Sequence, residues 1–335
     1  MLRIAINGFG RIGKNFFRSV LQDAGLQSDV QIVAINVGPE DPAALPYMIR
    51  YDSILGTWDI PSEYSPKGLN INNQHIKVFA EKDPANLPWK ELAIDWVVDV
   101  SGKFTNRIDA EKHVQAGAKK VLISAPAHGE DVSIIPGVND DVYDAKKHSI
   151  VSLGSCTTNA LMPVLKVLDQ SFGIEQAFVN TVHAYTNSQS LLDVNTDMRD
   201  PRKSRAAGIN IIPTSTGAQK MIEKILPHLA SKVLAQALRV PVANVSYLEV
   251  IAQIKKATDL EGLLIEFEEE KLRNRNILAV SHERLVSSDF MGNSHSVIID
   301  ASLCAANDSM VKVVGWYDNE WGYSCRLRDF LIKNK

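Results

Sequence analysis

The chain has 335 residues, of which 45% are hydrophobic and 22% are charged, and its formal net charge is −3. This length fits two domains or one large one, and the composition is that of a soluble globular protein. The charge gives no reason to expect nucleic acid as a partner, and without a long apolar run or a secretory leader no membrane partner is expected either.

The first part of the chain alternates strand-like and helix-like segments. Apolar runs with β-branched residues predict strands, and helical spacing of apolar residues predicts helices between them. The strands are expected at Leu2–Asn7, Val30–Ile35, Ile94–Val100 and Lys120–Ser124, and the helices at about Arg11–Asp23 and Asp109–Ala116. This alternation indicates βαβ units and a parallel sheet covered on both faces.

The pattern changes after about Gly154. Longer strands are predicted at Ala177–His183, Ser246–Ile254 and Ser296–Ile299, among helices at Ala160–Gln170, Gly217–Leu226 and Leu260–Arg273. This mixture indicates an α+β domain with a mixed or antiparallel sheet. Apolar residues at helical spacing within Trp321–Lys335 predict a terminal helix that packs back on an earlier domain.

Gly8, Gly10 and Gly13 form the pattern G-x-G-x-x-G between the first predicted strand and the first predicted helix. Glycines at these positions permit a tight turn, close approach of a pyrophosphate, and close packing of helix on strand. The helix N-terminus then offers N–H groups and a partial positive charge to phosphates. We therefore expect a dinucleotide-binding site of the Rossmann type here.

The acidic residue that usually follows the second strand, where it holds the ribose hydroxyls, is missing. Asn36 can still form a hydrogen bond, whereas the side chain of Val37 cannot accept one, and Glu40 and Asp41 lie further along the chain. Without a carboxylate, one barrier to a 2′-phosphate is removed, but no phosphate site is created. Both NAD and NADP stay open as cofactors.

Cys156 lies between an apolar strand and a helical run that begins at about Ala160. Ser155 and the threonines after Cys156 offer N-cap oxygens, so we expect Cys156 near a helix N-terminus, where the partial positive charge favours thiolate over thiol. A free cysteine is more often a small buried hydrophobe, and we prefer that interpretation for Cys304 and Cys325. Three cysteines cannot form a disulfide framework, and we expect a cytoplasmic protein with reduced thiols.

A nucleophilic cysteine usually needs a base. His183 ends an apolar strand and begins the polar stretch Ala184–Asn187, which suits a residue in a cleft. Taken alone, such a histidine is more often an ordinary core or surface residue. It is nevertheless the candidate base.

Six segments, in this order along nearly the whole chain, resemble the glyceraldehyde-3-phosphate dehydrogenase family. They are INGFGRIG (6–13), SCTTN (155–159), HAYT (183–186), NIIPTSTG (210–217), RVP (239–241) and WYDNEWGYS (316–324). The resemblance implies a Rossmann dinucleotide-binding domain plus an α+β catalytic domain with a mixed or antiparallel sheet. The expected boundaries are 1–155 with 319–335 for the first domain and 156–318 for the second.

The resemblance assigns Cys156 as the nucleophile and His183 as its base. It implies that Arg239 and Thr186 bind the substrate phosphate. The positions implied to bind the attacking phosphate are Ser155, Thr157, Thr216 and Gly217. Hydroxyl and N–H groups at helix starts, with one arginine, suit a tetrahedral dianion.

Further positions match residues that line the cofactor in the family, and no metal is expected. Asn319 matches the residue that fixes the nicotinamide carboxamide, and Tyr323 matches one that packs near the ring. The remaining cofactor positions are Gly8, Gly10, Arg11, Ile12, Gly13, Asn36, Ser101, Gly102, Phe104 and Ser124.

Several positions depart from the family's usual pattern. Val37 replaces the acidic ribose ligand, and Ser188 stands where an acidic or amide residue is common. The loop Asn195–Arg205 is about two residues longer than usual, and the segment Gly38–Pro42 is unusual beside the adenosine pocket. Because these changes cluster around cofactor selection, they motivate the hypothesis that NADP is used in a biosynthetic direction.

The expected reaction is the phosphorylating oxidation of D-glyceraldehyde 3-phosphate to 1,3-bisphosphoglycerate with NAD or NADP, as in glycolysis and gluconeogenesis. The partners expected are a sugar-phosphate aldehyde, inorganic phosphate and further copies of the chain in a homotetramer. One alternative is an erythrose-4-phosphate dehydrogenase, although the histidine and phosphate segments keep the triose form. An alternative of another class is a catalytically silent dinucleotide-binding protein.

Overall fold

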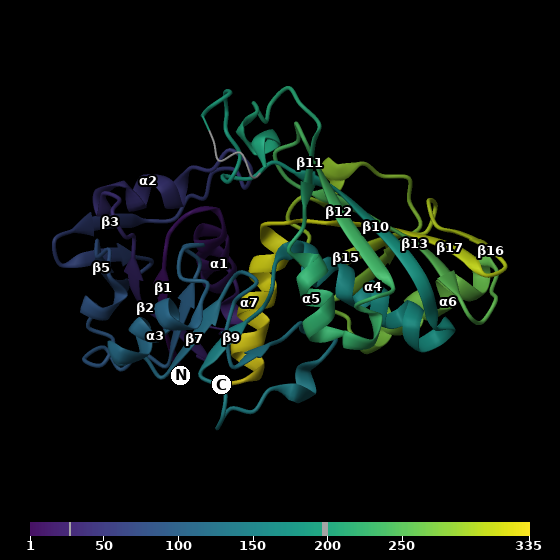
Figure 1. Ribbon diagram of the computed structural model, residues 1–335. Helices are drawn as coiled ribbons and strands as arrows, with labels where there is room; N and C mark the ends of the chain where they lie inside the picture. The colour runs from purple at the N-terminus through teal and green to yellow at the C-terminus, as the bar shows by residue number, and fades with distance from the viewer. Residues whose placement is uncertain (27, 196–199) are drawn as a thin grey trace. The chain divides into compact units, whose positions relative to one another are not determined.

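The computed structural model describes residues 1–26, 28–195 and 200–335, which form two compact units (Figure 1). Among these residues, the first unit takes 1–134, 139–154 and 324–335, and the second takes 135–138 and 155–323. The predicted domain boundaries remain a proposal. Residues 319–323 belong to the second unit by their contacts. Helix α7 (Trp321–Lys333) therefore begins in the second unit and continues in the first.

Within the described residues the first unit builds a nine-stranded sheet in the order β3-β4-β5-β2-β1-β6-β7-β9-β8. Its strands are β1 (Leu2–Asn7), β2 (Val30–Asn36), β3 (Ser62–Ser65), β4 (Gly68–Ile71), β5 (Gln74–Phe79), β6 (Trp96–Asp99), β7 (Lys120–Ile123), β8 (Val132–Ser133) and β9 (Ile150–Ser152). From β5 to β8 all neighbours pair in parallel, which confirms the predicted α/β arrangement. The antiparallel edge formed by β3 and β4 was not predicted.

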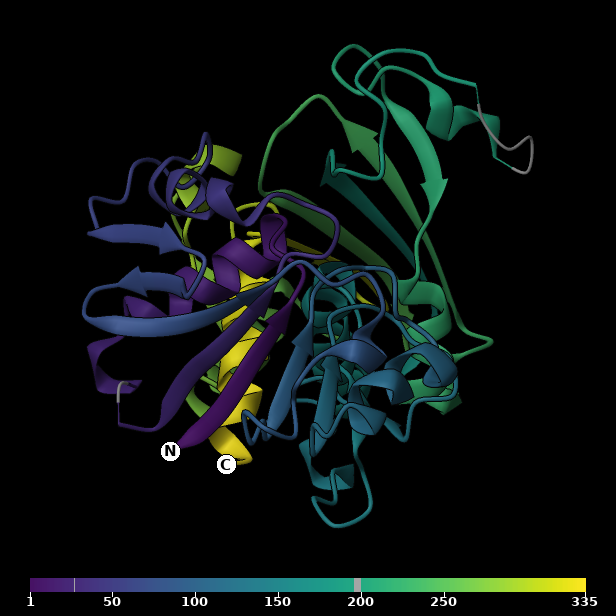
Figure 2. The ribbon, with the colours of Figure 1, turned by 90° about the vertical axis from the view of Figure 1, so that its left-hand side faces the viewer.

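Helices α1 (Arg11–Leu21), α2 (Leu45–Arg50) and α3 (Arg107–Gln115) belong to this unit. Strand β1 is an almost unbroken apolar run with Ile4 and Ile6 fully buried, as expected of a strand covered on both faces. The C-terminal part of α7 lies against the sheet (Figure 2). The ring of Phe330 on this helix meets that of Trp96 on β6 edge-on, with 5.8 Å between their centroids. The predicted terminal helix is therefore confirmed.

The second unit contains an eight-stranded mixed sheet within the described residues, in the order β11-β12-β10-β13-β17-β15-β14 with β16 paired to β17. The strands are β10 (Ile174–Ala184), β11 (Ile212–Ser215), β12 (Val233–Val240), β13 (Ser246–Ile254), β14 (Leu278–Ser281), β15 (Val297–Asp300), β16 (Ala305–Asn307) and β17 (Met310–Tyr317). Strand β10 pairs in parallel with β12 and antiparallel with β13. The predicted mixed sheet is confirmed.

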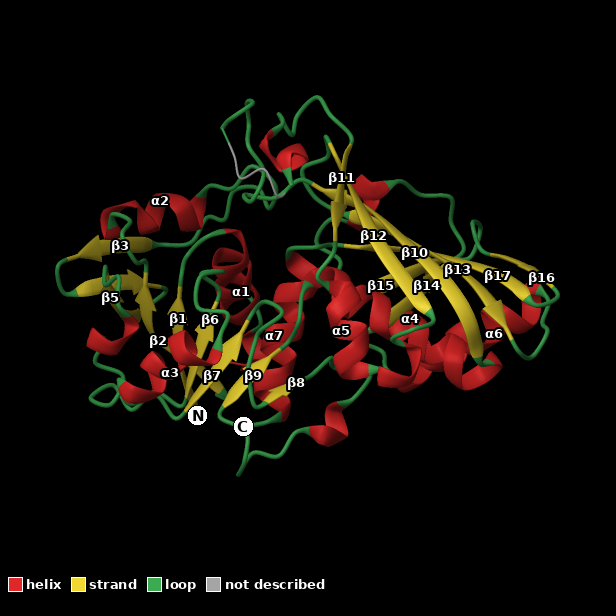
Figure 3. Ribbon diagram, in the orientation of Figure 1, coloured by secondary structure: helices red, strands yellow, loops and turns green. Residues whose placement is uncertain are grey.

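Helices α4 (Cys156–Phe172), α5 (Ala218–Ile225) and α6 (Leu260–Arg273) cover one face of this sheet (Figure 3). Leu161, Leu165 and Phe267 are fully buried between helices and strands. Burying a side chain of this size stabilises the fold by roughly 1.5–3 kcal/mol before entropy is counted. This core fixes the start of α4 relative to the strands that it covers.

The opposite face of the second sheet carries a row of exposed apolar side chains. Phe178 on β10 stands directly beside Leu234 on β12 and Ile251 on β13. Their side chains are 63%, 60% and 40% exposed. An apolar row of this kind is unusual on a monomer's surface.

One local expectation was wrong. Helix α4 begins at Cys156 and not at about Ala160, because Ser155 rather than a later threonine is the N-cap. Cys304 lies between β15 and β16 and is buried as expected. In the predicted long loop, Pro201–Ser204 form a 3-10 turn, and residues 196–199 lie outside the described residues. No described helix has both the length and the apolar character that crossing a membrane requires.

Candidate active site

Cys156 is the first residue of α4. The preceding Ser155 has extended backbone angles, and its Oγ accepts a hydrogen bond of 3.2 Å from the Thr158 N–H, which starts the helix at this point. The first turn of α4 contains no acidic residue. The sulfur therefore lies where the partial positive charge of a helix N-terminus is felt.

His183 lies beside this sulfur, with 3.4 Å between its Nε2 and the Sγ of Cys156. It is the penultimate residue of β10 and is 1% exposed. In the parallel pairing of β10 with β12, His183 stands opposite Arg239, so the two side chains leave the sheet on one face. The Nη1 of Arg239 is 2.6 Å from the Nδ1 of His183.

Burial sets the protonation of this pair. Desolvation, and after it the charge on Arg239, lower the pKa of His183 to about 3. Desolvation raises the pKa of Cys156, and this outweighs the lowering by Arg239 and by the bonds from Thr157. Burial therefore opposes charge on both groups, whereas the helix N-terminus and the charge on Arg239 favour the thiolate of Cys156.

The Nδ1 of His183 has two neighbours that exclude each other as partners. It lies 2.6 Å from the carbonyl oxygen of Ala184, which only accepts, and 2.6 Å from Arg239, which only donates. With a proton on Nδ1 the bond to Ala184 forms, and without one the bond from Arg239 forms. Only the first tautomer leaves a lone pair on Nε2 facing the sulfur, so the position of Arg239 decides whether His183 can act as a base.

The residues expected to bind phosphate lie at two helix starts and one strand end. Ser155 and Thr157 flank Cys156 at the start of α4. Thr216 and Gly217 precede α5, where the Thr216 Oγ1 accepts from the Ala218 N–H at 3.2 Å, and α5 lies beside α4 (Figure 3). Thr186 follows β10, and its hydroxyl is 2.9 Å from that of Ser188.

Asn319 is buried, and its amide orientation is fixed by Ser246. The Ser246 Oγ accepts from the Ala184 N–H at 3.1 Å and donates to the Asn319 Oδ1 at 2.9 Å. The Nδ2 of Asn319 is then the group that can donate to a ligand carbonyl, as a nicotinamide carboxamide requires. Tyr323, the other expected nicotinamide neighbour, is 4% exposed.

The first unit has the features of a pyrophosphate-binding turn. Gly8 has a φ of +97°, and a Cβ there would lie 2.8 Å from the backbone of Ser101. A Cβ on Gly13 would lie 2.5 Å from the Gly8 carbonyl oxygen, so helix and strand could not approach as they do. Gly10 caps α1 without a side-chain hydrogen bond, and no atom lies within 4 Å of a Cβ built there. This open, backbone-lined helix start fits a dinucleotide.

Asn36 supports this edge of the sheet from within. Its Nδ2 donates to the Asn7 Oδ1 at 2.7 Å and to the Glu81 carbonyl at 3.0 Å, and its Oδ1 accepts from the backbone of Glu81 and Gly38. The whole amide is engaged within the protein. The sequence suggested that the Asn36 side chain could form a hydrogen bond to the ribose. In the structure its amide instead bonds to Asn7, Glu81 and Gly38. Val37 is buried at 7% exposure.

A buried carboxylate extends this network. The Asp99 Oδ2 accepts from the Asn7 Nδ2 at 2.8 Å, and the Nε2 of His113 lies 3.2 Å from it. The Asp99 Oδ1 accepts from both the N–H and the Oγ of Ser101. Because the Trp89 indole can only donate to the Nδ1 of His113, the histidine proton is on Nε2 and points to Asp99. These bonds join the carboxyl ends of β1, β2 and β6.

The other expected cofactor residues lie at the ends of parallel strands or on α1. Gly102 has a φ of +70°, Phe104 meets His113 edge-on at 5.9 Å, and the Ser124 N–H donates to the Asp99 carbonyl. Arg11 and Ile12 open α1. The side chain of Arg11, with that of Lys14, bonds to the carboxylate of Asp52, which sequence reasoning missed.

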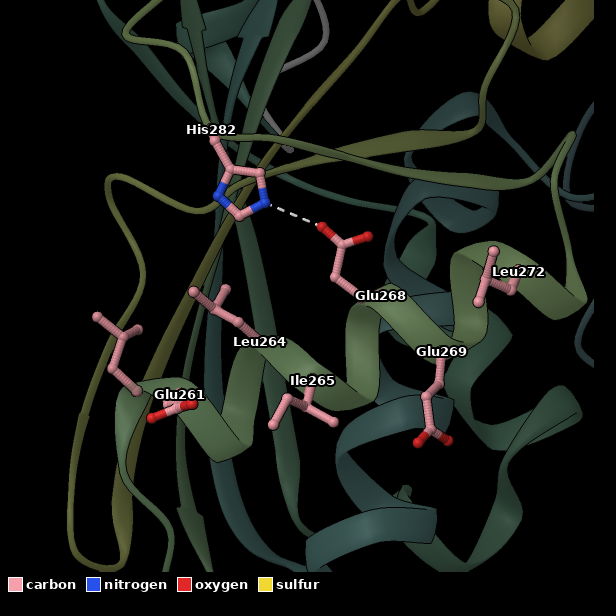
Figure 4. Close-up of a pocket in the computed structure, with 8 residues that line it drawn as sticks. Glu261, Leu264, Ile265, Glu268, Glu269, Leu272 and His282 are labelled. Carbon is pink, nitrogen blue, oxygen red and sulfur yellow. Dashed lines mark hydrogen bonds and ion pairs between the residues drawn. The ribbon is translucent and has the colours of Figure 1, made fainter.

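A hollow of about 630 Å³ on α6 is a poor alternative site (Figure 4). Leu264, Ile265 and Leu272 of the helix give it an apolar lining. The Nε2 of His282 lies 2.9 Å from a carboxylate oxygen of Glu268 at its edge. It contains no cysteine or other strong nucleophile. In the described part of the chain no cluster of His, Cys, Asp and Glu could hold a metal ion.

Both halves of the chain match models of one protein family. Residues 2–107 match the family model "Glyceraldehyde 3-phosphate dehydrogenase, NAD binding domain", and residues 155–319 match the model of the C-terminal domain of the same family. Glyceraldehyde-3-phosphate dehydrogenase 1 of Bacillus subtilis is 46% identical over 332 residues, which cover 98% of this chain and 96% of the relative. The Geobacillus stearothermophilus enzyme has the same identity and coverage.

The two matched models together span most of the chain, and the relatives align with it almost from end to end. The first unit is thus an NAD(P)-binding domain of the Rossmann type, and the second contains the paired cysteine and histidine. The chain belongs to the glyceraldehyde-3-phosphate dehydrogenase family of oxidoreductases.

Proposed function

We propose that the chain catalyses the phosphorylating oxidation of D-glyceraldehyde 3-phosphate to 1,3-bisphosphoglycerate through a thioester on Cys156. The observation that supports this most is the approach of the Cys156 Sγ to the His183 Nε2 at 3.4 Å, beside the guanidinium of Arg239. A nucleophile, a base and a cation for a phosphate group meet at one place. The relatives named for this activity support the same substrate.

The first half of the reaction oxidises the aldehyde. The sulfur of Cys156 adds to the aldehyde carbon, and the thiol proton passes through His183 to the aldehyde oxygen, which gives a hemithioacetal. The Nε2 of His183 then accepts the hydroxyl proton as a hydride leaves the same carbon, and a thioester remains. A bound nicotinamide supplies the hydride acceptor at its C4. General-base assistance of this kind contributes roughly 10²–10⁴-fold to the rate.

The second half transfers the acyl group to phosphate. An oxygen of inorganic phosphate attacks the thioester carbon, the carbon–sulfur bond breaks, and Cys156 takes back a proton from His183. Ser155, Thr157, Thr216 and Gly217 are proposed to hold this phosphate. Their position at the starts of α4 and α5 supports the assignment, because helix N-termini favour anions.

Through Arg239, binding of the substrate phosphate can change the tautomer of His183, the proposed base. In the structure its guanidinium is directed at the Nδ1 of His183. A phosphate dianion, bound by Arg239 with Thr186, is a stronger acceptor than this nitrogen and would draw the guanidinium away. The Nδ1 proton can then bond to Ala184, and the lone pair of Nε2 turns to the sulfur. Aldehydes without a phosphate group would react poorly for this reason.

The cofactor is NAD or NADP, and we propose that NADP is used. The support is the apolar Val37 where a carboxylate would repel a 2′-phosphate, together with the internal use of the Asn36 amide. The measurement is kcat/KM with each dinucleotide for the wild type and for Val37→Asp. A strong preference of the wild type for NAD would end the hypothesis.

The active form is proposed to be a cytoplasmic homotetramer. The row formed by Phe178, Leu234 and Ile251 on the uncovered face of the second sheet supports self-association. Sedimentation of the wild type and of Phe178→Glu checks this, because a charge in the row should shift the protein toward smaller species.

The central test is the replacement Cys156→Ser, with Cys304→Ser as the matched control, because Cys304 is buried away from the histidine. Acyl phosphate formation should fall at least about a thousandfold in the first variant and stay unchanged in the second. An unchanged rate in Cys156→Ser would refute the thioester.

Two alternatives have their own readouts. An erythrose-4-phosphate dehydrogenase would prefer the tetrose aldehyde and would not need added phosphate. A silent binding protein would bind dinucleotide but leave Cys156 no more reactive to iodoacetate than Cys304 and Cys325. The approach of His183 to Cys156 argues against the second.

A further inference from the structure

Tyr317 lies underneath the reacting pair, at the end of β17. It is 1% exposed, and its hydroxyl is 2.7 Å from the Thr181 Oγ1 and 3.1 Å from the Thr157 Oγ1. Its ring meets that of His183 edge-on, with 5.8 Å between centroids. One side chain thus contacts the residue after Cys156, a neighbour of His183 on β10, and His183 itself.

The direction of these hydrogen bonds follows from the chemistry of the partners. The Thr181 hydroxyl donates to the carbonyl of Tyr247 at 2.9 Å, and a carbonyl can only accept. The single proton of Thr181 is therefore used, so Tyr317 donates to Thr181. Having given its own proton away, Tyr317 must accept from the Thr157 hydroxyl. The order of donation runs from Thr157 through Tyr317 and Thr181 to Tyr247.

This order couples two elements that carry the chemistry. Thr157 belongs to the first turn of α4, directly after Cys156. Thr181 and His183 are two residues apart on β10, so their side chains leave the strand on the same face. Desolvation raises the pKa of Tyr317, so its hydroxyl keeps the proton that this arrangement needs at any physiological pH.

We propose that Tyr317 is a positioning residue for the thioester chemistry, whose hydroxyl holds the start of α4 and the end of β10 at the separation that brings Cys156 to His183. This proposal rests on the proposed function for its role in catalysis.

The test uses Tyr317→Phe, which removes one oxygen and keeps the buried ring. The matched control is Tyr247→Phe, whose hydroxyl donates to Glu249 at 3.5 Å and whose side chain alternates away from that of its neighbour Ser246. Thr181→Val removes the acceptor next to Tyr317 at nearly constant volume. All variants are made in the full-length chain.

The first measurement is the pre-steady-state burst of reduced dinucleotide, whose amplitude counts active sites and whose rate reports chemistry per site. In Tyr317→Phe the burst rate should fall about tenfold with an unchanged amplitude, as expected for the loss of a positioning hydroxyl and its two hydrogen bonds. Thr181→Val should show a similar loss, and the double variant should be little worse than either, because both break the same chain.

The second measurement needs no turnover. Alkylation of Cys156 by the neutral reagent iodoacetamide should slow about tenfold in Tyr317→Phe, while Cys304 and Cys325 react as in the wild type. If the wild type shows no burst but this slowing occurs, the proposed function fails and the positioning role stands.

Three outcomes would overturn the proposal. One is a burst rate and an alkylation rate equal to those of Tyr247→Phe. Another is a lower burst amplitude with an unchanged rate per site, since that means only fewer folded molecules. The third is additive losses in Tyr317→Phe and Thr181→Val, because independent effects are incompatible with one hydrogen-bonded chain.

Discussion

Asp52 anchors the first turn of α1 and allows a quantitative prediction. Its side chain is 1% exposed, and its Oδ2 accepts from Arg11 and, at 2.8 Å, from Lys14. Its Oδ1 accepts from the backbone N–H groups of Ile54 and Leu55 at 2.9 Å each. The replacement Asp52→Asn keeps the shape and an oxygen for the backbone bonds but removes the charge.

The magnitude follows from the two bonds to cations. A hydrogen bond to a charged group contributes roughly 1.5–3 kcal/mol, and an amide whose oxygen stays on the backbone N–H groups turns its NH2, which cannot accept, toward the two cations. We therefore expect Asp52→Asn to lower the free energy of unfolding of the first unit by about 3–5 kcal/mol, as for a buried ion pair that loses one partner. The control is Asp59→Asn, because Asp59 is 87% exposed and pairs only with Arg50 at the surface, so its loss should stay below about 0.5 kcal/mol.

The pH dependence has a definite sign. Desolvation would raise the pKa of Asp52, but the bonds from Arg11 and Lys14 outweigh it and lower the pKa below the ordinary value. The unfolded chain then binds the proton more readily, so the stabilisation is complete above about pH 4–5 and is lost as the pH falls toward the folded pKa. The difference between wild type and Asp52→Asn should shrink over the same range.

The assay is urea unfolding at pH 7 and at several values below pH 4, in parallel for the wild type and both variants. Equal losses in Asp52→Asn and Asp59→Asn would refute the reasoning. A difference that does not change with pH would also refute it, because the effect would then come from packing and not from charge.

Three further predictions concern buried groups. Asn36→Leu removes the partner of the Asn7 Oδ1 and of the Glu81 backbone, so the free energy of unfolding should fall by about 2–4 kcal/mol and ADP-ribose should bind more weakly by calorimetry; an unchanged affinity would contradict this. Because the pKa of His183 is lowered to about 3, the free energy of unfolding of the wild type should fall as the pH falls from about 6.5 toward 3. His183→Asn should lack this contribution to the pH dependence, and equal pH slopes of the two proteins would contradict the prediction. Phe267→Ala should cost about 3–5 kcal/mol by urea unfolding, since the ring is fully buried; a loss below 1 kcal/mol would mean that the core closes over the gap.

Much of the fold could be predicted from local patterns. The strand Ser246–Ile254 and the helix Leu260–Arg273 coincide with β13 and α6, because each is a long segment with one clear period. The short strands β3 and β4 were missed, since four residues give too little periodicity to separate from a loop.

The candidate site could be predicted where its residues carry a local signal, as Cys156 and His183 do at the ends of elements. Tyr317 could not, because its partners Thr157 and Thr181 are 160 and 136 residues away in the sequence. The raised pKa of Cys156 was missed for a related reason. A sequence shows that a helix begins at the sulfur, but it does not show how much protein surrounds it.

Asn36 and Val37 are neighbours in the sequence but differ in structural role, because the Asn36 amide is used entirely within the protein. The residue at position 36 joins strand ends through Asn7 and Glu81, while position 37 and those after it lie beyond that junction. The segment that begins at Val37 can therefore be exchanged without loss of the bonds that join the strand ends. If that segment sets coenzyme choice, as we propose, a graft that spares Asn36 changes the choice alone, whereas one that replaces Asn36 also removes those bonds.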